Sequence, residues 1–544
     1  MKKLLGVLGR VFGFGRGGTR QPSPLPWDRR PSIYEWVRSH VRPDGPGMTE
    51  EGYHLPDEEL VDAKLQVRWA PGAYDGVLTH HVLPDHNEEA ARKAVELVLA
   101  YCKRPTEKTK VALYQHLLNN RVVSIADSVL TAVFKAKKIN SRVLYDLAYW
   151  LATESPDREP VKFGIALLGL FQQPDNSELF QTLGRHDEFT LFCAIALLNS
   201  QENPEEALWT LARNVTGWGR IHVVERLADT QNPLIKDWLL REGYRNSVMD
   251  EYLAVICART GGLLQALRGE RVDRELLIAA GDIIEAMING GPAEGIDDYQ
   301  DAPAVIELYL RHMQSLAETV EDFLHVACIK RYLEEDESKW QKRYDLGWTE
   351  QLRHRCRATC DSILSGPEWP ERIRAGLNAS NESEFHRANE AAKVLGLDTW
   401  EIHWQRLQAQ PTEPSRWYYV MSLCNAERIE VIVRFAEQVL DLSAIATGAA
   451  EELGLGPKFR LHSCLDYILQ ELGHYPGHGC KLIQAALKSP TVSNRNHAVS
   501  AIAQWPQALW AMEIKQALEQ AASVEPDEKL RDRMEKLLRG ESVI

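Results

Sequence analysis

Residues 191–215 read LFCAIALLNSQENPEEALWTLARNV, which is two apolar segments separated by a short polar stretch. The first segment contains the small residue Ala194, and the second runs from Ala207 to Val215. Within both segments the apolar residues recur with the 3.6-residue period of an amphipathic helix. This stretch therefore predicts two helices joined by a short turn.

The same pattern continues on both sides of this stretch. A small or branched residue stands inside successive predicted helices, at steps of 32, 34, 28, 30 and 30 residues. These residues are Ala100, Ala132, Ala166, Ala194, Val224 and Ala254. A second amphipathic segment lies between each two of them, at 111–118, 144–151, 179–183, 207–215 and 234–240. Two helices in roughly 30 residues are typical of an α-solenoid, in which each helix pair buries its apolar face against the next.

The fold class predicted from this period is all-α, a HEAT-like α-solenoid of stacked helix pairs in two arrays with a small irregular N-terminal cap. We expect five parts along the chain. They are a flexible basic tail (1–26), the irregular cap (27–86), a first helical array (87–288), an acidic hinge rich in turn-forming residues (289–302) and a second array (303–544). The charged final helix, 526–538, would cover the C-terminal end of the stack.

The cap contains one segment that does not fit the helical period. Residues 65–69 alternate between apolar and polar side chains, which indicates a short strand or an extended segment. A cap at this place is physically reasonable, because the first unit of a solenoid must cover the apolar end of the stack.

The charge of the chain excludes one class of partner. Its 544 residues carry a formal net charge of −14, so the protein as a whole does not attract nucleic acid. Residues 1–45 are the exception, because nine Lys and Arg against three Asp and Glu give 9 − 3 = +6. With the apolar residues near the start, this basic segment could contact a membrane surface, and the alternative is a disordered tail.

The cysteines and the apolar segments bear on the compartment. The nine cysteines are odd in number, are spread along the chain and mostly occupy apolar helical positions. Buried free thiols in a reducing compartment are the simple interpretation. No apolar run reaches the length that a transmembrane helix needs. We therefore expect a cytoplasmic protein without a transmembrane segment.

Three groups of residues could hold a metal ion. The best candidate is the glycine-rich turn with His474, His478 and Cys480. The second group is His80 and His81 with His86, and the third is Cys356 and Cys360 near His354. None has a complete four-ligand spacing. The alternative for the two cysteines, four apart on one helix, is that they face a core, and the alternative for His474, His478 and Cys480 is that they have only a structural role in the turn.

Two other patterns have structural explanations. Residues 13–18 match the string G-x-G-x-x-G, but no strand precedes them, so they do not indicate a dinucleotide site. Tryptophans gather in the second array and either line an apolar groove or fill the space between helices. They are Trp340, Trp348, Trp369, Trp400, Trp404, Trp417, Trp505 and Trp510.

Several sequence runs resemble a group of bacterial HEAT-like repeat proteins, at least one of which carries the name limonene hydroxylase. These runs are 69–76 with His80 and His81, 184–191, 203–211 through 226–227, and 489–498. The resemblance implies oxidation of the cyclic monoterpene limonene to carveol or perillyl alcohol, with further NAD(P)-linked dehydrogenation. It transfers no catalytic or cofactor-binding residue to this chain.

Three kinds of function follow from the sequence, and one of them is recruitment to a membrane surface through the basic N-terminal segment, which predicts loss of lipid binding when residues 1–26 are deleted. As an enzyme, the protein would be a monooxygenase that takes a small apolar terpene and needs a centre that activates oxygen. As a scaffold, it would bind protein partners along a solenoid groove without turnover. The residues alone favour the scaffold, and the resemblance favours the oxidoreductase.

Overall fold

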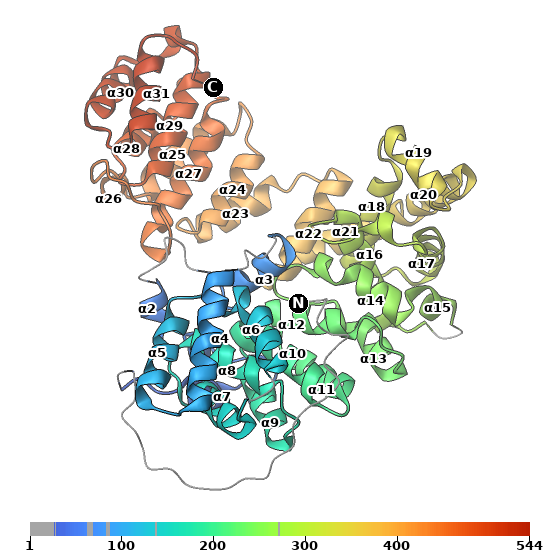
Figure 1. The fold of residues 1–544 in the computed structure, drawn as a ribbon. Coiled ribbons are helices and arrows are strands. Elements are labelled where there is room, and N and C mark those ends of the chain that lie inside the picture. The colour runs from blue at the N-terminus through green and yellow to red at the C-terminus, as the bar shows by residue number, and fades with distance from the viewer. Residues whose placement is uncertain are drawn as a thin grey trace. The chain divides into compact units, whose positions relative to one another are not determined.

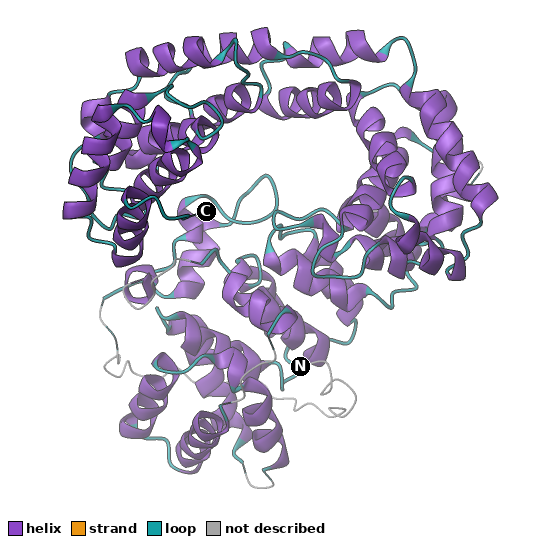
Figure 2. Cartoon of the chain, turned by 90° about the horizontal axis from the view of Figure 1, so that it is seen from above, coloured by secondary structure: helices purple, strands orange, loops and turns teal. Residues whose placement is uncertain are grey.

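The computed structural model describes residues 27, 29–62, 69–82, 87–136, 139–269 and 272–543. Within these residues the fold is all-α, with helices α1 to α31, no strand and two isolated β-bridges. Figure 2 shows helices joined by loops along all of the described chain. The chain forms two compact units, Met1–Trp369 and Pro370–Ile544. The predicted all-α class is confirmed.

The first unit begins with helix pairs stacked in two layers (Figure 1). One layer consists of α4 (Glu88–Lys103), α6 (Ala126–Lys135), α8 (Arg158–Leu168), α10 (Asp187–Ser200) and α12 (Trp218–Val224). The other consists of α5 (Glu107–Leu118), α7 (Ser141–Glu154), α9 (Pro174–Leu183) and α11 (Pro204–Ala212). Within the first layer each helix contacts the next, α4 with α6 and so on to α12. In this arrangement equivalent helices of successive pairs stack on one another, as predicted for a solenoid.

The stack continues through the rest of the first unit. Its helices are α13 (Pro233–Trp238), α14 (Ala254–Gly261), α15 (Leu263–Arg268), α16 (Arg274–Asn289), α17 (Ala302–Leu316), α18 (Val320–Leu333), α19 (Glu337–Asp345) and α20 (Glu350–Leu364). Helix α14 packs on α16, α16 on α18 and α18 on α20. The segment 289–302, which the sequence suggests as a hinge, joins α16 to α17 inside this unit and contains the short helix η6 (Ile296–Asp298).

Short helical turns lie between many of these helices. They are η1 (Glu51–Tyr53), η2 (Val122–Ser124), η3 (Glu225–Leu227), η4 (Leu239–Gly243) and η5 (Asp250–Tyr252), with η7 (Pro457–Phe459) and η8 (Gln507–Leu509) in the second unit.

The irregular N-terminal segment packs against helices of both layers, between α7 and α12. It contains α1 (Ile33–His40), α2 (Glu58–Asp62) and α3 (Ala73–His80). Helix α1 packs against α7 and α9, and α3 packs against α12. The predicted tail, 1–26, and residues 65–68 of the predicted extended run lie outside the described residues.

Buried ion pairs join this N-terminal segment to the helical stack. The ammonium group of Lys162 on α8, 1% exposed, lies 2.7 Å from Asp75 Oδ2 on α3 and 2.6 Å from Glu188 Oε1 on α10. Burial alone would lower the pKa of Lys162, but the carboxylates around it raise that pKa, so the group stays charged. The Arg158 guanidinium binds both carboxylate oxygens of Asp57. Charges buried in this way must be paired, so the pairs fix where the segment lies.

The recurring small residues mark successive helices of the repeat, but they do not all lie on the buried face of their helix. Ala194, Val224 and Ala254 are fully buried. Ala166 is half-buried, and Ala100 is exposed. In α4 the buried stripe runs instead through Ala91, Ala94, Val98, Tyr101 and Cys102. The steps of 32 and 34 residues therefore predict the succession of helices correctly, but they do not predict which face of each helix packs against its neighbours.

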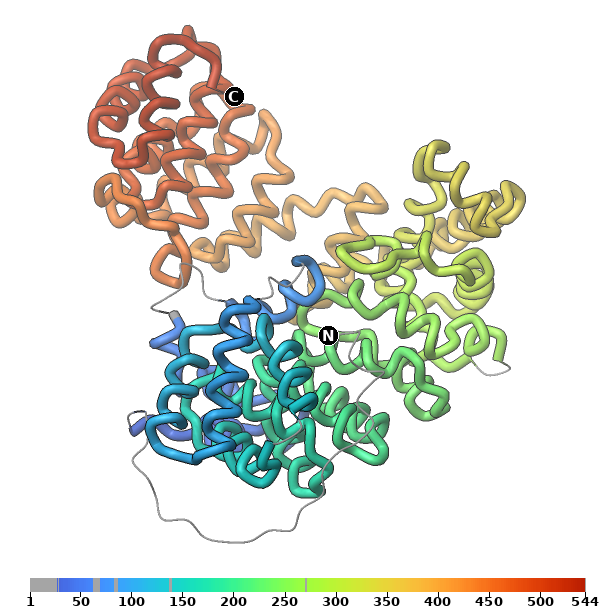
Figure 3. The backbone as a smooth tube through the Cα atoms, viewed as in Figure 1, coloured from blue at the N-terminus to red at the C-terminus, as the bar shows by residue number. Residues whose placement is uncertain are grey.

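The second unit begins within α21 (Trp369–Leu377) and is a smaller helical stack (Figure 3). Its helices are α22 (Glu382–Leu395), α23 (Trp400–Ala409), α24 (Pro414–Ser422), α25 (Ile429–Val439), α26 (Leu442–Ile445), α27 (Arg460–Leu472), α28 (Cys480–Leu487), α29 (Val492–Gln504), α30 (Met512–Val524) and α31 (Glu528–Leu538). Helix α24 packs on α27, α27 on α29 and α29 on α31. The final helix buries Leu530, Met534 and Leu537 and exposes most of its charged residues, which suits the end of a stack.

Most of the singled-out tryptophans fill the space between helices. Five of the eight are buried, namely Trp340, Trp348, Trp369, Trp417 and Trp505. The other three, Trp400, Trp404 and Trp510, are partly buried against the core of the second unit. These contacts support the packing interpretation over an open groove lined by tryptophan. None of the described helices is long and apolar enough to cross a membrane.

Replacing the buried ammonium tests the role of the ion pairs. We expect Lys162→Met to lower the free energy of unfolding of the first unit by about 3 kcal/mol or more, because Asp75 and Glu188 lose their buried partner. Urea unfolding followed by circular dichroism measures the change. The control is Lys93→Met on α4. The Lys93 side chain pairs with Glu96 and is more than half exposed, so we expect the free energy of unfolding to change by no more than about 0.5 kcal/mol. Equal losses in the two variants would contradict the account.

Candidate functional site

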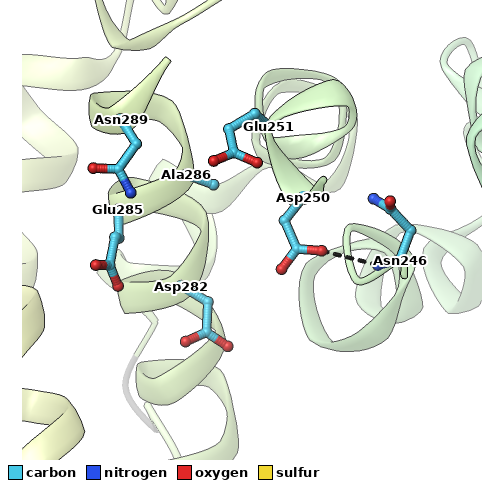
Figure 4. Close-up of a pocket in the computed structure, with 7 residues that line it drawn as sticks. All are labelled: Asn246, Asp250, Glu251, Asp282, Glu285, Ala286 and Asn289. Carbon is cyan, nitrogen blue, oxygen red and sulfur yellow. Dashed lines mark hydrogen bonds between the residues drawn. The ribbon is translucent and has the colours of Figure 1, made fainter. Parts of the chain in front are cut away.

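A polar hollow of about 350 Å³ opens on the first unit (Figure 4). It is lined by Asn246, Asp250, Glu251, Asp282, Glu285, Ala286 and Asn289. Four of these seven side chains are carboxylates, two are amides, and one is apolar. We call this feature the acidic hollow.

One wall of the acidic hollow is the outward face of α16. Asp282, Glu285 and Asn289 follow at intervals of three and four residues, so they share one face of this helix. The opposite face carries residues such as Ile283 and Met287, which are buried in the core. Burial of the apolar face therefore leaves the acidic stripe turned outward.

Asp282 is held in place by three donors from neighbouring elements. Tyr244 donates to Asp282 Oδ2 at 2.6 Å, Arg245 donates to the same oxygen at 3.1 Å, and His325 Nε2 lies 3.1 Å from Oδ1. Burial opposes ionisation of this carboxyl, but His325, Tyr244 and Arg245 more than offset it and hold the pKa of Asp282 below its usual value. Asp282 is therefore a fixed negative charge at neutral pH.

The opposite wall comes from the short helix η5. Asp250 and Glu251 begin it and face α16 across the hollow (Figure 4). The backbone N–H of Asn246 donates to Asp250 Oδ1 at 2.9 Å, which fixes this carboxylate. Burial raises the pKa of Asp250.

The electrostatic character of the hollow follows from these two walls. Four carboxylates line it, and the guanidinium of Arg245 binds one of them. Carboxylates gathered in a concave surface concentrate cations there. The arrangement can bind positive charge, and its lining consists of four carboxylates, two amides and one apolar side chain.

The residues of the predicted glycine-rich turn each have separate surroundings. His474 is exposed. His478 Nδ1 lies 3.3 Å from Glu430 Oε2, and the Cys480 thiol donates to the Gly477 carbonyl at 3.6 Å. Burial raises the pKa of Cys480, which favours the neutral thiol over the thiolate that binds metals. A metal ion bound by His474, His478 and Cys480 stays a prediction from the sequence.

The residues of the other two predicted metal-binding groups also have separate surroundings. Cys356 and Cys360 are buried, and burial raises the pKa of Cys356 to about 12, so this pair behaves as core residues. His354 is mostly exposed and lies 3.7 Å from Glu350. His80 lies 3.0 Å from Glu225, and His81 lies 2.5 Å from the Tyr252 hydroxyl. His86 is outside the described residues.

No protein-family model matches the chain, and no curated protein is significantly similar to it. The resemblance to HEAT-like repeat proteins therefore rests on the quoted sequence runs, while the helical stack rests on the structure.

Sequence reasoning missed the acidic hollow. The spacing of Asp282, Glu285 and Asn289 on a predicted helix was a usable signal, since it places three polar groups on one face. Nothing local indicates that Asp250 and Glu251 would face them, because that contact depends on how η5 packs against α16.

Alkylation of the cysteines tests the burial described above. We expect that in the folded protein iodoacetamide modifies at most Cys424 and Cys480, the two half-buried thiols, and modifies both slowly because burial raises their pKa. The other seven thiols are buried and should react after unfolding. Mass spectrometry of tryptic peptides before and after denaturation gives the answer. Fast modification of Cys356 or Cys360 in the folded protein would be inconsistent with this packing.

Proposed function

We propose that this protein is a helical-repeat scaffold that binds a basic segment of a partner protein in the acidic hollow. The observation that supports the proposal most directly is the set of four carboxylates around a hollow of about 350 Å³. The stacked helix pairs support it as well, because such arrays offer long surfaces to other proteins.

The size and lining of the hollow favour a basic side chain over other ligands. A single metal ion needs several oxygen ligands within about 2.6 Å of it, and the carboxylates of the hollow are not among the described groups of three or more ligand atoms that lie within 4.8 Å of one another. An apolar ligand needs a mainly apolar lining, and Ala286 is the one apolar residue here. A lysine or arginine side chain can place its charge among the carboxylates and its stem toward the opening.

The donors already bound to Asp282 favour the same conclusion. Arg245, Tyr244 and His325 hold this carboxylate rigidly, so binding a cation does not require it to be ordered. Asn246 does the same for Asp250. We also place the protein in the cytoplasm, where its nine free cysteines would stay reduced.

Oxidation of limonene with NAD(P) is the alternative proposal, and it is supported by the sequence resemblance. It predicts carveol or perillyl alcohol when the purified protein is incubated with limonene, oxygen and NAD(P)H. Product formation above a heat-denatured control would replace the scaffold proposal, and no product would leave the scaffold as the better account.

Neutralising the less constrained carboxylates tests the scaffold proposal. The change is Glu251→Gln with Glu285→Gln, since Asp282 and Asp250 have roles in local packing. We expect the affinity for a fluorescent lysine-rich peptide to fall roughly 10-fold, because two attractive charges are lost. Fluorescence anisotropy measures the binding, and raising the salt concentration should weaken it in the unchanged protein.

The matched control is Glu275→Gln, which neutralises a carboxylate on the same helix outside the hollow, where it contacts Arg241. This variant should bind the peptide as the unchanged protein does. Spermidine as a competitor shows whether a free polyamine suffices in place of a protein segment. Equal affinity in the double variant and the control would overturn the proposal.

A further inference from the structure

Three side chains that are far apart in sequence meet where α3 packs against α12. His80 is the last residue of α3, His222 lies in α12, and Glu225 begins η3 directly after it. The spacing of three residues places His222 and Glu225 on the same side of the helical path. One potential ligand atom from each of the three lies within 4.8 Å of the other two.

The geometry of His80 determines which of its ring nitrogens is available. His80 Nδ1 lies 2.8 Å from the Gly76 carbonyl oxygen, and a carbonyl can accept only, so Nδ1 carries a proton. The nearby Thr79 hydroxyl does not have to donate to this nitrogen, because it is within donating distance of the Asp75 carbonyl, at 2.8 Å. In the neutral ring the lone pair is then on Nε2, 3.0 Å from Glu225 Oε1. Two acceptors at this distance need a cation between them.

His222 supplies an independent observation at the same place. Its side chain is 2% exposed, and its Nε2 has no hydrogen-bond partner among the described residues. Such a buried polar atom costs about 1–3 kcal/mol when it stays unsatisfied. A metal ion is one group that would satisfy it.

The surroundings suit a bound ion. The ring of Trp218 lies 5.6 Å from that of His80 and 6.2 Å from that of His222, and the ring of Tyr252 lies 5.5 Å from that of His80, so aromatic groups lie beside both histidines. Aromatic rings at this place limit solvent access to an ion, and the charge of the neighbouring Arg226, which acts on His222, is offset by the carboxylate of Glu225. His80 and Glu225 keep 14% and 20% of their side-chain surface exposed, which leaves a path for the ion to enter.

The orientation of His80 resembles that of metal-binding histidines in general. Such a histidine donates its second ring N–H to a carboxylate or to a backbone carbonyl, as His80 does to Gly76. The position of Gly76 is also constrained, because any side chain there would collide with the ring of Trp218. The close packing of α3 on α12 thus sets the place of His80.

We propose that His80, His222 and Glu225 bind one divalent first-row transition-metal ion. Two imidazoles and one carboxylate are ligands for ions such as Zn²⁺ and Fe²⁺, whereas Ca²⁺ and Mg²⁺ take oxygen ligands. Ligand atoms about 2.1 Å from a tetrahedral ion lie roughly 3.4 Å apart, so side-chain shifts on the order of 1 Å complete the site. With three protein ligands, a fourth position stays open to water or a ligand. This site is separate from the acidic hollow and does not depend on the scaffold proposal.

A proton is the competing occupant. If His80 is an imidazolium, its Nε2–H donates to Glu225 and the pair needs no metal. The two possibilities predict different results, because only the metal site binds one metal ion per chain. The stoichiometry of metal binding is therefore the quantity to measure.

The experiment is a titration of the full-length protein with Co²⁺ after chelator treatment, followed by visible absorption. We expect one Co²⁺ per chain with ligand-field bands, and competition by Zn²⁺. His80→Gln and Glu225→Gln should each lower the affinity at least about 100-fold. Circular dichroism checks their fold. Glu225 is partly exposed, so its variant tests the site even if the substitution of His80 prevents folding.

Two controls separate this site from the other candidates. His478→Gln removes a residue of the glycine-rich turn, and the double variant Glu251→Gln, Glu285→Gln removes two carboxylates of the acidic hollow. Neither should change Co²⁺ binding. The proposal is overturned if the unchanged protein binds no stoichiometric Co²⁺, if His80→Gln and Glu225→Gln bind it normally, or if either control abolishes binding.

Discussion

The buried ammonium group of Lys162 is the constraint on which the first unit depends. It lies on α8 and contacts carboxylates on α3 and on α10, at 2.7 Å and 2.6 Å. A charge that is 1% exposed is stable only when it is paired, so these three helices must come together. Gly72 adds to the same junction, because its N–H donates to Glu188 at 3.0 Å just before α3 begins. The position of α3 then places His80 beside α12.

Much of the fold could be predicted from the sequence because helix periodicity is a local signal. The recurring residues from Ala100 to Ala254 each fall within an even-numbered helix from α4 to α14, and the segments between them coincide with the intervening helical elements. The buried face was less predictable, as Ala100 shows, since it depends on neighbours from other repeats. The path of the N-terminal segment was not predictable either, because its contacts, such as Arg158 with Asp57, join residues 101 positions apart.

The residues of the two sites also fall into those that local sequence could predict and those that only long-range contacts bring together. The stripe of Asp282, Glu285 and Asn289 can be read from helical spacing, whereas its facing wall comes from another element. His80 was visible as a candidate ligand, but His222 and Glu225 were not, since Glu225 is 145 residues away from it. The glycine-rich turn was also found from sequence alone, and there the structure adds local partners, such as the Gly477 carbonyl that accepts from the Cys480 thiol. Local patterns thus predict which elements form, and the long-range ion pairs decide which side chains meet.

The measurement that tests this account most directly is native-state hydrogen exchange of the backbone amides in α3. If the buried pairs fix α3 on the stack, its amides should exchange as slowly as those of α8, because both are released by the same opening of the first unit. Fast exchange in α3 while α8 and α10 stay protected would contradict the account. It would mean that α3 detaches without disturbing the helices that hold Lys162 and Glu188.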